Sequence, residues 1–311
     1  MNSSTTKIHL PDFLIIGAGK SGTTSLEAYL DQHPEIFLPT RKEPNFFAYE
    51  HRRADEFSDL ETIEHFNTSV TTYEAYSALF EQAKEEHKVG EISNTYMYMP
   101  GSIDNINKYI PEAKFIAILR QPAERLFSRY MHLVRVNKQP EGEFEDLFDK
   151  QSIWWERADL INEGYYYRNL KQYFDAFDAS RIKVLLHEDL LKQRDETLAE
   201  MCRFLGVSDC FEFKSSTFYN QSGVIKNQGL NKLIGNDSVL IKGMKRVSPA
   251  IYDKIKSSNF LKDVVEKVRN KNLERKKLSP ELKSRISHEI YGEDIANLSK
   301  LIDRDLSHWL V

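Results

Sequence analysis

Short apolar runs alternate along this chain with longer stretches in which apolar residues recur every three or four positions. The first run, at 12–16, reads Asp-Phe-Leu-Ile-Ile and is typical of a strand buried inside a parallel sheet. The stretch 23–30 follows with its apolar residues on one helical face, and His33-Pro34 ends the predicted helix.

The same order of strand and helix occurs again further along the chain. A second strand is predicted at 113–120, and Gln121-Pro122 turns it into a helix over about 123–136. A third strand is predicted at 181–186, after another helical stretch. This alternation predicts an α/β fold with a central parallel sheet, helices on both faces and right-handed crossovers. We expect one domain over residues 1–311, with a helical C-terminal portion.

A glycine-rich turn, Gly-Ala-Gly-Lys-Ser-Gly at 17–22, joins the first strand to the first helix. The backbone N–H groups of such a turn and the dipole of the following helix together form an anion site. Glycine allows the close approaches that this turn needs. The strand, the internal Lys20 and the pair Thr23-Thr24 at the helix start predict a phosphate-binding loop.

This loop differs from the loops of two nucleotide-binding classes. The ATP and GTP pattern is G-x-x-x-x-G-K-[ST], whereas residue 23 is threonine and the lysine comes earlier, at Lys20. A dinucleotide loop of the G-x-G-x-x-G type needs an acidic strand end about 20 residues later, and the segment 36–44 has no clear one. We therefore expect phosphate binding without nucleoside-triphosphate chemistry.

A second phosphate site is predicted where the strand 113–120 ends. Arg120 lies at its carboxyl end, and Ser128 follows about two helical turns later. A guanidinium group and a hydroxyl group both bind phosphate oxygens, so two such sites suit a nucleotide phosphorylated at both ends of its ribose. Arg125 and Arg129, one turn apart, are expected to be surface charges.

Composition limits the class of protein. The 311 residues are 41% hydrophobic and 29% charged, and the formal net charge of −4 argues against a general nucleic-acid binder. Neither a membrane span nor a signal peptide is recognisable, so we expect a cytoplasmic protein. The two cysteines cannot by themselves fill a four-ligand zinc site. The stretch 242–285 has 14 Lys and Arg against 5 Asp and Glu; we interpret it as a solvated helical surface, with binding of an anionic acceptor as the alternative.

At these motifs the chain resembles the sulfotransferases that use 3′-phosphoadenosine 5′-phosphosulfate (PAPS), and most closely their bacterial and heparan-type branch. The loop 19–25 resembles the family's 5′-phosphosulfate loop, and the segment 120–128 resembles its 3′-phosphate motif. The segment 41–47, Arg-Lys-Glu-Pro-Asn-Phe-Phe, is similar to the stretch that carries that branch's catalytic glutamate, and 218–227 is similar to its late cofactor-binding loop. The resemblance runs over nearly the whole chain and implies the P-loop-like sulfotransferase fold.

The resemblance implies an enzyme that transfers the sulfuryl group of PAPS to an acceptor hydroxyl or amine, releases adenosine 3′,5′-bisphosphate (PAP) and needs no metal. Lys20 would stabilise the leaving phosphate as charge develops on it. Lys226 stands where relatives often have arginine, and it supplies charge without a bidentate fork. The implied cofactor-binding residues are Gly19, Lys20, Ser21, Gly22, Thr23, Thr24, Ser25, Arg120, Ser128, Tyr219 and Lys226.

Glu43 is the general base that the resemblance implies. The neighbouring Phe46-Phe47 favours a raised pKa for this carboxyl group through desolvation. An ion pair with Lys42 or Lys20 that only orders the loop is the alternative role for Glu43, and His132 is the alternative base.

Glu91 and several aromatic residues are further candidates, most of them with a structural alternative. Glu91 is expected either to line the acceptor cleft or to serve a structural role. Trp155, Tyr166 and Tyr219 are candidates to stack on adenine or on the acceptor, with core packing as the alternative. Trp309 is expected to pack the C-terminal helix.

Two other classes of function remain open: a P-loop kinase that uses ATP, and a non-catalytic nucleotide-binding module. The displaced Lys20 argues against the kinase, and the presence of both Lys20 and Glu43 argues against the module. The resemblance to the heparan-type branch favours a carbohydrate or another polar acceptor. We expect a small-molecule or glycan acceptor and no nucleic-acid partner.

Overall fold

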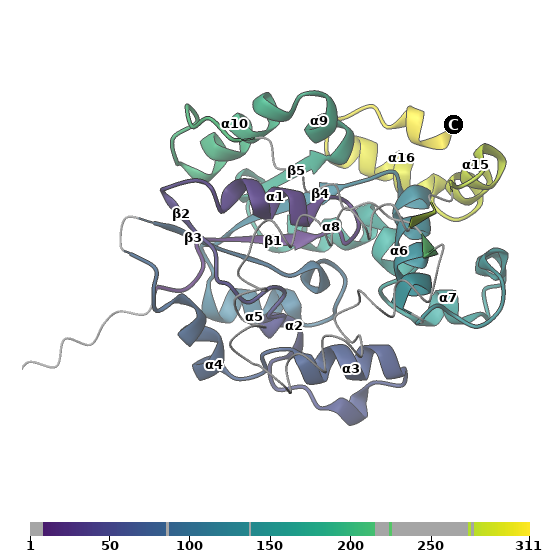
Figure 1. Cartoon of the computed structure of the whole chain (residues 1–311), viewed down its shortest axis with the longest axis horizontal. Helices are drawn as coiled ribbons and strands as arrows, with labels where there is room; N and C mark the ends of the chain where they lie inside the picture. The colour runs from purple at the N-terminus through teal and green to yellow at the C-terminus, as the bar shows by residue number, and fades with distance from the viewer. Residues whose placement is uncertain (1–8, 85–86, 137, 215–223, 226–272, 275–276) are drawn as a thin grey trace, which may run out of the picture. The chain divides into compact units, whose positions relative to one another are not determined.

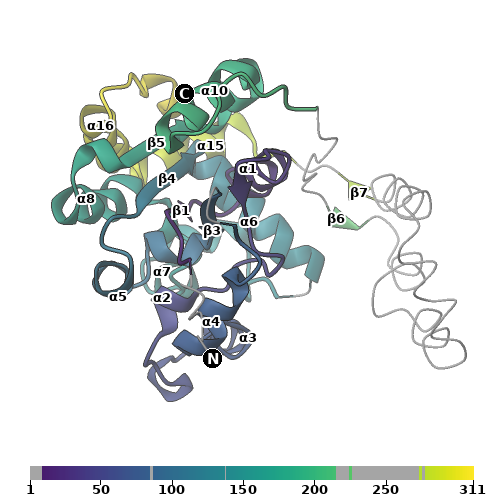
Figure 2. The same ribbon diagram turned by 90° about the vertical axis from the view of Figure 1, so that its left-hand side faces the viewer.

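The computed structural model describes residues 9–84, 87–136, 138–214, 224–225, 273–274 and 277–311. Contacts group the chain into two compact units. The first unit contains the described residues up to 129, those from 140 to 214 and those from 279 onwards. The second contains the described residues of 130–139 and of 221–278, including β6 (Val224–Ile225) and β7 (Leu273–Glu274), which pair antiparallel (Figure 2). The single domain over residues 1–311 stays a prediction.

Five parallel strands form the central sheet of the first unit (Figure 1). The strands, in their order across the sheet, are β2 (Ile36–Phe37), β3 (Lys88–Ile92), β1 (Phe13–Gly17), β4 (Lys114–Leu119) and β5 (Ile182–Leu186). The middle strand β1 pairs with both β3 and β4, with Phe13 opposite Gly90 and Lys114. The predicted parallel sheet is confirmed, and its two motif strands are direct neighbours.

Helices cover both faces of the sheet. The α-helices are α1 (Thr23–Leu30), α2 (Phe46–Tyr49), α3 (Leu60–Thr68), α4 (Tyr73–Ser77), α5 (Ser102–Tyr109), α6 (Pro122–Val136), α7 (Ile153–Glu156), α8 (Tyr166–Ala176), α9 (His187–Lys192), α10 (Arg194–Leu205), α15 (Pro280–Glu289) and α16 (Gly292–Leu301). On one face, apolar side chains such as Ile15 and Ile118 pack against α1, α9 and α10. On the other face, the ring of Phe115 contacts the rings of Tyr173 and Phe177. This double burial explains why β1, and β4 after its first residue Lys114, are apolar.

Short 3-10 helices connect several of these elements. They are η1 (Ala54–Glu56), η2 (Ala78–Phe80), η3 (Asn94–Met97), η4 (Phe144–Phe148), η5 (Asn162–Gly164), η6 (Ala179–Arg181) and η7 (Ser307–Leu310). The predicted helical C-terminal portion is confirmed: α15, α16 and η7 end the chain, and α16 packs against α8 (Figure 2). Trp309 is buried, and its indole N–H donates to Glu188 Oε1 at 2.8 Å.

Strand β3 was not expected from the sequence. Its residues, Lys-Val-Gly-Glu-Ile, lack an apolar run, because Gly90 leaves room for the ring of Phe13 on β1 and Glu91 is a charged residue type. None of the helices in the described part of the chain is long and apolar enough to cross a membrane.

Candidate active site

The phosphate loop lies between β1 and α1, at the carboxyl edge of the sheet. The Ala18 N–H donates to Ile118 O at 2.9 Å, which ties the start of the loop to β4. Gly22 precedes α1 with a left-handed φ of 105°, and a Cβ at this position would lie 3.0 Å from Cδ2 of His187. Both constraints favour glycine over any residue with a side chain.

Helix α1 begins in a way that suits an anion. Among the described residues, no side chain caps its N-terminus and no acidic residue lies in its first turn. The first N–H groups of a helix have no partner within the helix, and they lie at the positive end of its dipole. The α1 N-terminus therefore keeps its positive potential for a ligand, as the motif predicts.

Part of the loop is committed to contacts within the protein. The Gly19 N–H donates to Glu163 Oε1 at 2.6 Å, and the Ser21 N–H donates to Ala18 O at 3.2 Å. Ser21 is fully buried, so its hydroxyl group faces protein. Lys20 has a left-handed φ of 67° and is partly exposed. Of the remaining predicted loop residues, Thr23 is buried, whereas Thr24 and Ser25 keep partial exposure.

Arg120 lies directly after β4, next to the phosphate loop because β4 is the neighbour of β1. Its guanidinium group forms an ion pair with Glu124, with Nη2 and Nε at 3.0 and 3.2 Å from Oε2. With this pair formed, the Arg120 side chain is 27% exposed. Ser128 is buried two turns along α6, with 5% of its surface exposed.

His187 is a further candidate for the site, and the sequence analysis assigned it no role. It follows β5 directly, so it lies at the same carboxyl edge as Arg120, and its ring approaches Gly22. Burial and then the positive charge of Arg120 lower the pKa of His187. The neutral form of this imidazole is therefore favoured, beside Gly22 and near Arg120. Its position after a strand of this sheet was the signal that could have revealed it.

Glu43 lies exposed on a segment with a left-handed φ of 46°. Surrounding protein nevertheless desolvates the carboxyl group and raises its pKa; Arg129, Lys20 and Lys42 oppose this rise, whereas Glu27 adds to it. The direction expected from the sequence is confirmed. Glu43 and Lys20 are thus within electrostatic reach of each other, although they come from different segments.

The amide of Asn94 orients the Glu43 carboxyl group: Nδ2 donates to Oε1 at 2.7 Å. Lys42 is paired with Glu27 at 2.7 Å. Asn94 follows β3, an element the sequence analysis missed, so this contact had no sequence signal.

Glu91 is fully buried, so it does not line an acceptor cleft. Three hydroxyl groups donate to its carboxyl group: Ser93 at 2.5 Å, Tyr96 at 2.7 Å and Tyr76 at 3.1 Å. Desolvation by burial raises its pKa to about 7, against the lowering effect of these hydrogen bonds. Ser93 Oγ also accepts the Asn45 N–H at 3.0 Å, so Glu91 fixes the hydroxyl group that holds the segment carrying Glu43.

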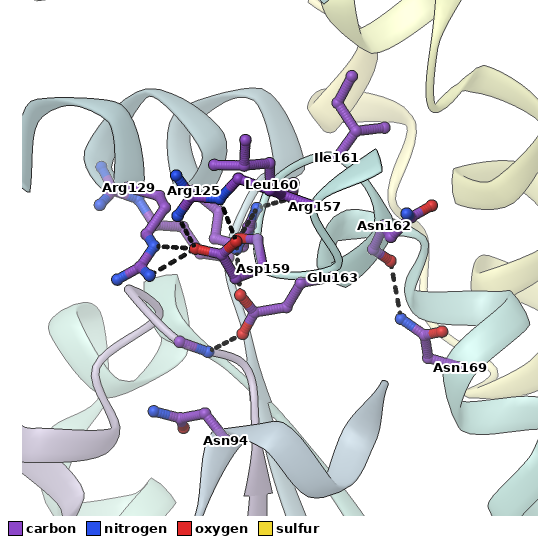
Figure 3. Close-up of polar contacts among 12 residues, drawn as sticks. Asn94, Arg125, Arg129, Arg157, Asp159, Leu160, Ile161, Asn162, Glu163 and Asn169 are labelled. Atoms are coloured by element: carbon purple, nitrogen blue, oxygen red, sulfur yellow. Dashed lines mark hydrogen bonds and ion pairs between the residues drawn. The ribbon is translucent and has the colours of Figure 1, made fainter. Parts of the chain in front are cut away.

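The expectation that Arg125 and Arg129 are surface charges is wrong. Arg125 is completely buried and forms an ion pair with Glu163 at 2.5 Å, while Arg129 pairs with Asp159 at 2.5 Å (Figure 3). Both acidic partners come from the segment before α8: Glu163 is 38 residues after Arg125, and Asp159 is 30 residues after Arg129. Helical spacing alone cannot show such partners.

The remaining candidates lie elsewhere. Tyr166 is buried in the core with its hydroxyl group donating to Arg120 O at 2.8 Å, and the Trp155 indole N–H donates to Leu147 O at 3.0 Å. His132 belongs to the second unit, where its Nδ1 lies 2.9 Å from Arg135 Nη2. Tyr219, Lys226 and most of the basic stretch 242–285 lie outside the described residues.

Comparisons with known proteins agree with this architecture. A model of the sulfotransferase family matches residues 11–212. The crystal structure of a sulfotransferase from Alicyclobacillus acidocaldarius is 28% identical, with a TM-score of 0.68, and the match covers 97% of this chain and 99% of that one.

Two curated relatives match this chain over only part of their own length. The membrane-associated sulfotransferase kil1 of Dictyostelium discoideum is 31% identical over 173 residues, which are 54% of this chain and 32% of that protein. The bifunctional heparan sulfate N-deacetylase/N-sulfotransferase 1 of Caenorhabditis elegans is 25% identical over 224 residues, or 70% of this chain and 24% of that protein. The chain thus spans about a quarter to a third of these relatives. By the extent of its match to the family model, the chain belongs to the sulfotransferase family.

Proposed function

We propose that this chain transfers the sulfuryl group of PAPS to a hydroxyl or amine group of a carbohydrate or another polar acceptor, and releases PAP. The observation that carries the proposal is the position of Glu43 at the carboxyl edge of the sheet: it accepts a hydrogen bond from Asn94, which follows β3, the neighbour of the strand β1 that leads into the phosphate loop. This position brings a carboxyl group of raised pKa to a phosphate loop that has its own lysine. A base and a group that stabilises the leaving phosphate are the two functions that sulfuryl transfer requires.

The residues at the carboxyl edge of the sheet fit a nucleotide with two phosphate groups. The α1 N-terminus with Lys20, Thr23 and Thr24 would hold the 5′-phosphate, as the uncapped helix start supports. Arg120 and Ser128 would hold the 3′-phosphate, and His187 would offer a ring nitrogen to the same nucleotide. Gly19, Ser21, Gly22 and Ser25 would shape the loop, and Tyr219 and Lys226 remain predicted contacts.

The reaction is a single in-line displacement on sulfur. Glu43 accepts the proton of the acceptor hydroxyl group while the oxygen of that hydroxyl group bonds to sulfur. Lys20 stabilises the charge that develops on the 5′-phosphate oxygen as the bond between sulfur and that oxygen breaks. PAPS supplies the sulfuryl group, and the products are the sulfated acceptor, PAP and the proton held on Glu43.

A carbohydrate acceptor is supported by the relatives. Carbohydrate sulfotransferase 15 of Homo sapiens is 26% identical over 251 residues, and the Caenorhabditis relative is named for heparan sulfate. Incubation with labelled PAPS and a panel of glycans, phenols and amines tests this class directly. Transfer to phenols alone would contradict the carbohydrate assignment.

The substitution Glu43→Gln tests the base. It keeps the shape of the side chain and removes its proton-accepting ability, so turnover should fall by ~10²–10⁴-fold, the usual contribution of a general base. The calorimetric affinity for PAP should stay nearly unchanged, because the proposed role gives the Glu43 side chain a contact with the acceptor and none with PAP. Glu74→Gln, at an exposed position of α4, is the matched control and should retain turnover.

Near-normal turnover of Glu43→Gln at saturating acceptor would exclude Glu43 as the base, and His132→Asn would be examined next.

Thermal shifts on ligand binding distinguish a sulfotransferase from a P-loop kinase. PAP should raise the melting temperature of the wild-type chain, and magnesium ATP should not. The reverse result would favour a P-loop kinase, and PAP binding without any transfer would favour a binding module.

A further inference from the structure

Glu163 is a buried carboxyl group that contacts the phosphate loop directly. Its side chain is 4% exposed, and it has a charged partner on one side and a backbone N–H on the other. Oε2 lies 2.5 Å from Nη1 of Arg125, and Oε1 accepts the Gly19 N–H at 2.6 Å (Figure 3). A hydrogen bond to a buried, charged acceptor is stronger than one between neutral groups.

The carboxyl group of Glu163 lies so close to the backbone of Gly19 that it leaves no room for a side chain there. A Cβ at position 19 would lie 2.9 Å from Glu163 Oε1, so any other residue would displace the loop or the carboxyl group. The carboxyl group cannot easily give way, because Arg125 is fully buried and also donates to Leu160 O. The loop is therefore held at residue 19 by a rigid buried contact.

This contact directs one loop N–H away from the ligand. The Gly19 N–H faces Glu163 and the Ser21 N–H donates to Ala18 O, so the 5′-phosphate would be held by Lys20 and by N–H groups from Gly22 onwards. A negative carboxyl group next to an anion site would normally repel phosphate. Here the Arg125 guanidinium group, 2.5 Å away, compensates the negative charge. The pKa of Glu163 is nevertheless raised, because desolvation by burial outweighs the opposing charges of Arg125 and Arg129.

Arg125 also connects the loop to the second phosphate site. It lies on α6, one helical turn before Ser128, and only Gln121 separates Arg120 from the start of that helix. The same side chain that pairs with Glu163 therefore belongs to the helix that carries the 3′-phosphate residues. Gly19, Glu163 and Arg125 form a continuous chain of contacts between the two predicted phosphate sites.

We propose that Glu163 is a positioning residue for the nucleotide: by accepting the Gly19 N–H while paired with Arg125, it fixes the phosphate loop relative to α6 so that both phosphates of one nucleotide are bound together. This inference rests on the proposed function, because it assumes that the loop and α6 bind the two ends of PAP. It assigns Glu163 no contact with the nucleotide itself.

The test measures what the 5′-phosphate adds to binding. Calorimetry gives the affinities of PAP and of adenosine 3′-phosphate for the wild-type chain and for Glu163→Gln, and their ratio is the gain from the 5′-phosphate. Glutamine cannot accept from Gly19 and Arg125 at once, so this ratio should fall about tenfold or more, as for loss of a charge-assisted hydrogen bond. The affinity for adenosine 3′-phosphate should change little.

Glu50→Gln is the matched control. Glu50 is another buried carboxyl group, with Lys108 at 3.0 Å and Tyr109 as partners, but it does not contact the loop. Its substitution should leave the ratio unchanged even where stability falls. Gly19→Ala perturbs the same contact from the loop side without removing a buried charge, and it should lower the ratio as Glu163→Gln does.

The outcomes separate the two levels of inference. A wild-type chain that binds PAP no more tightly than adenosine 3′-phosphate would contradict the proposed 5′-phosphate loop. A wild-type gain that a folded Glu163→Gln retains in full, or an equal loss for both nucleotides, would overturn the role of Glu163. If circular dichroism shows that Glu163→Gln does not fold, an unchanged ratio in Gly19→Ala overturns it instead.

Discussion

The buried carboxyl group of Glu91 should make the stability of this protein fall as the pH rises, and Glu91→Gln should remove that dependence. Glu91 is fully buried, and the groups that face it are the hydroxyl groups of Tyr76, Tyr96 and Ser93 and the carboxyl group of Glu43. None of these is a cation. The charged form therefore loses its hydration without gaining an ion pair.

The size of the effect follows from the pKa. Burial raises the pKa of Glu91 from 4.5 to about 7 on folding. Between these values the folded state holds more protons than the unfolded state, so the free energy of unfolding decreases as the pH rises through this window. Once the pH exceeds the folded value, the full cost of about 3 kcal/mol is present. From pH 5.5 to pH 8.0 the cost should increase by about 2 kcal/mol.

The assay compares melting temperatures of the wild-type chain and Glu91→Gln at pH 5.5 and at pH 8.0. Glutamine has no proton to lose, so the melting temperature of the variant relative to wild type should rise by about 4 °C between the two pH values. A constant offset from imperfect hydrogen bonding of the amide cancels in this comparison. Glu145→Gln, an exposed position, should show the same offset at both pH values. An offset for Glu91→Gln that does not change with pH, or changes in the opposite direction, would refute the reasoning.

Three further predictions concern the site. Arg120→Ala should weaken PAP binding roughly tenfold to a hundredfold. Glu124→Gln removes the internal partner of Arg120 and should strengthen PAP binding. If calorimetry gives the two variants the same affinity for PAP, Arg120 is not a phosphate ligand. Asn94→Ala removes the hydrogen-bond donor to Glu43, so it should lower kcat about tenfold and leave the affinity for PAP unchanged. It should also move the acid limb of the pH profile of kcat to higher pH. An acid limb that does not move would show that Asn94 does not act through Glu43. Turnover should survive dialysis against EDTA, and its loss, with recovery on adding magnesium, would contradict the metal-free chemistry.

The sequence predicts the part of the fold that has a repeated hydrophobic pattern. The strands β1, β4 and β5 are apolar runs because both faces of the sheet are covered, and the helices that follow β1 and β4 have regular apolar faces. The edge strand β2 has two residues, and β3 contains a glycine and a glutamate, so neither produces such a pattern. The glycine and the glutamate of β3 become understandable only from their neighbours, the Phe13 ring and three hydroxyl groups.

The same distinction applies to the site. The phosphate loop and Arg120 could be found because each follows a strand directly, and strand ends of a parallel sheet lie at one edge. The ion pairs of Arg125 and Arg129 could not, because their partners Glu163 and Asp159 are distant in sequence and belong to no repeating pattern. The fold pairs Arg125 with a buried carboxylate and Arg129 with a partly buried one.

The central place of β1 in the sheet has a consequence for how the chain folds during synthesis. Among the described strands of the central sheet, β1 comes first along the chain, yet its partners are made later: β3 places Gly90, and β4 places Lys114, opposite Phe13. Until they emerge, both hydrogen-bonding edges of the apolar segment Phe13–Gly17 have no strand to pair with. Such long-range parallel pairing slows folding and prolongs the lifetime of aggregation-prone intermediates. The nascent chain is therefore expected to depend on chaperones until at least β4 has left the ribosome.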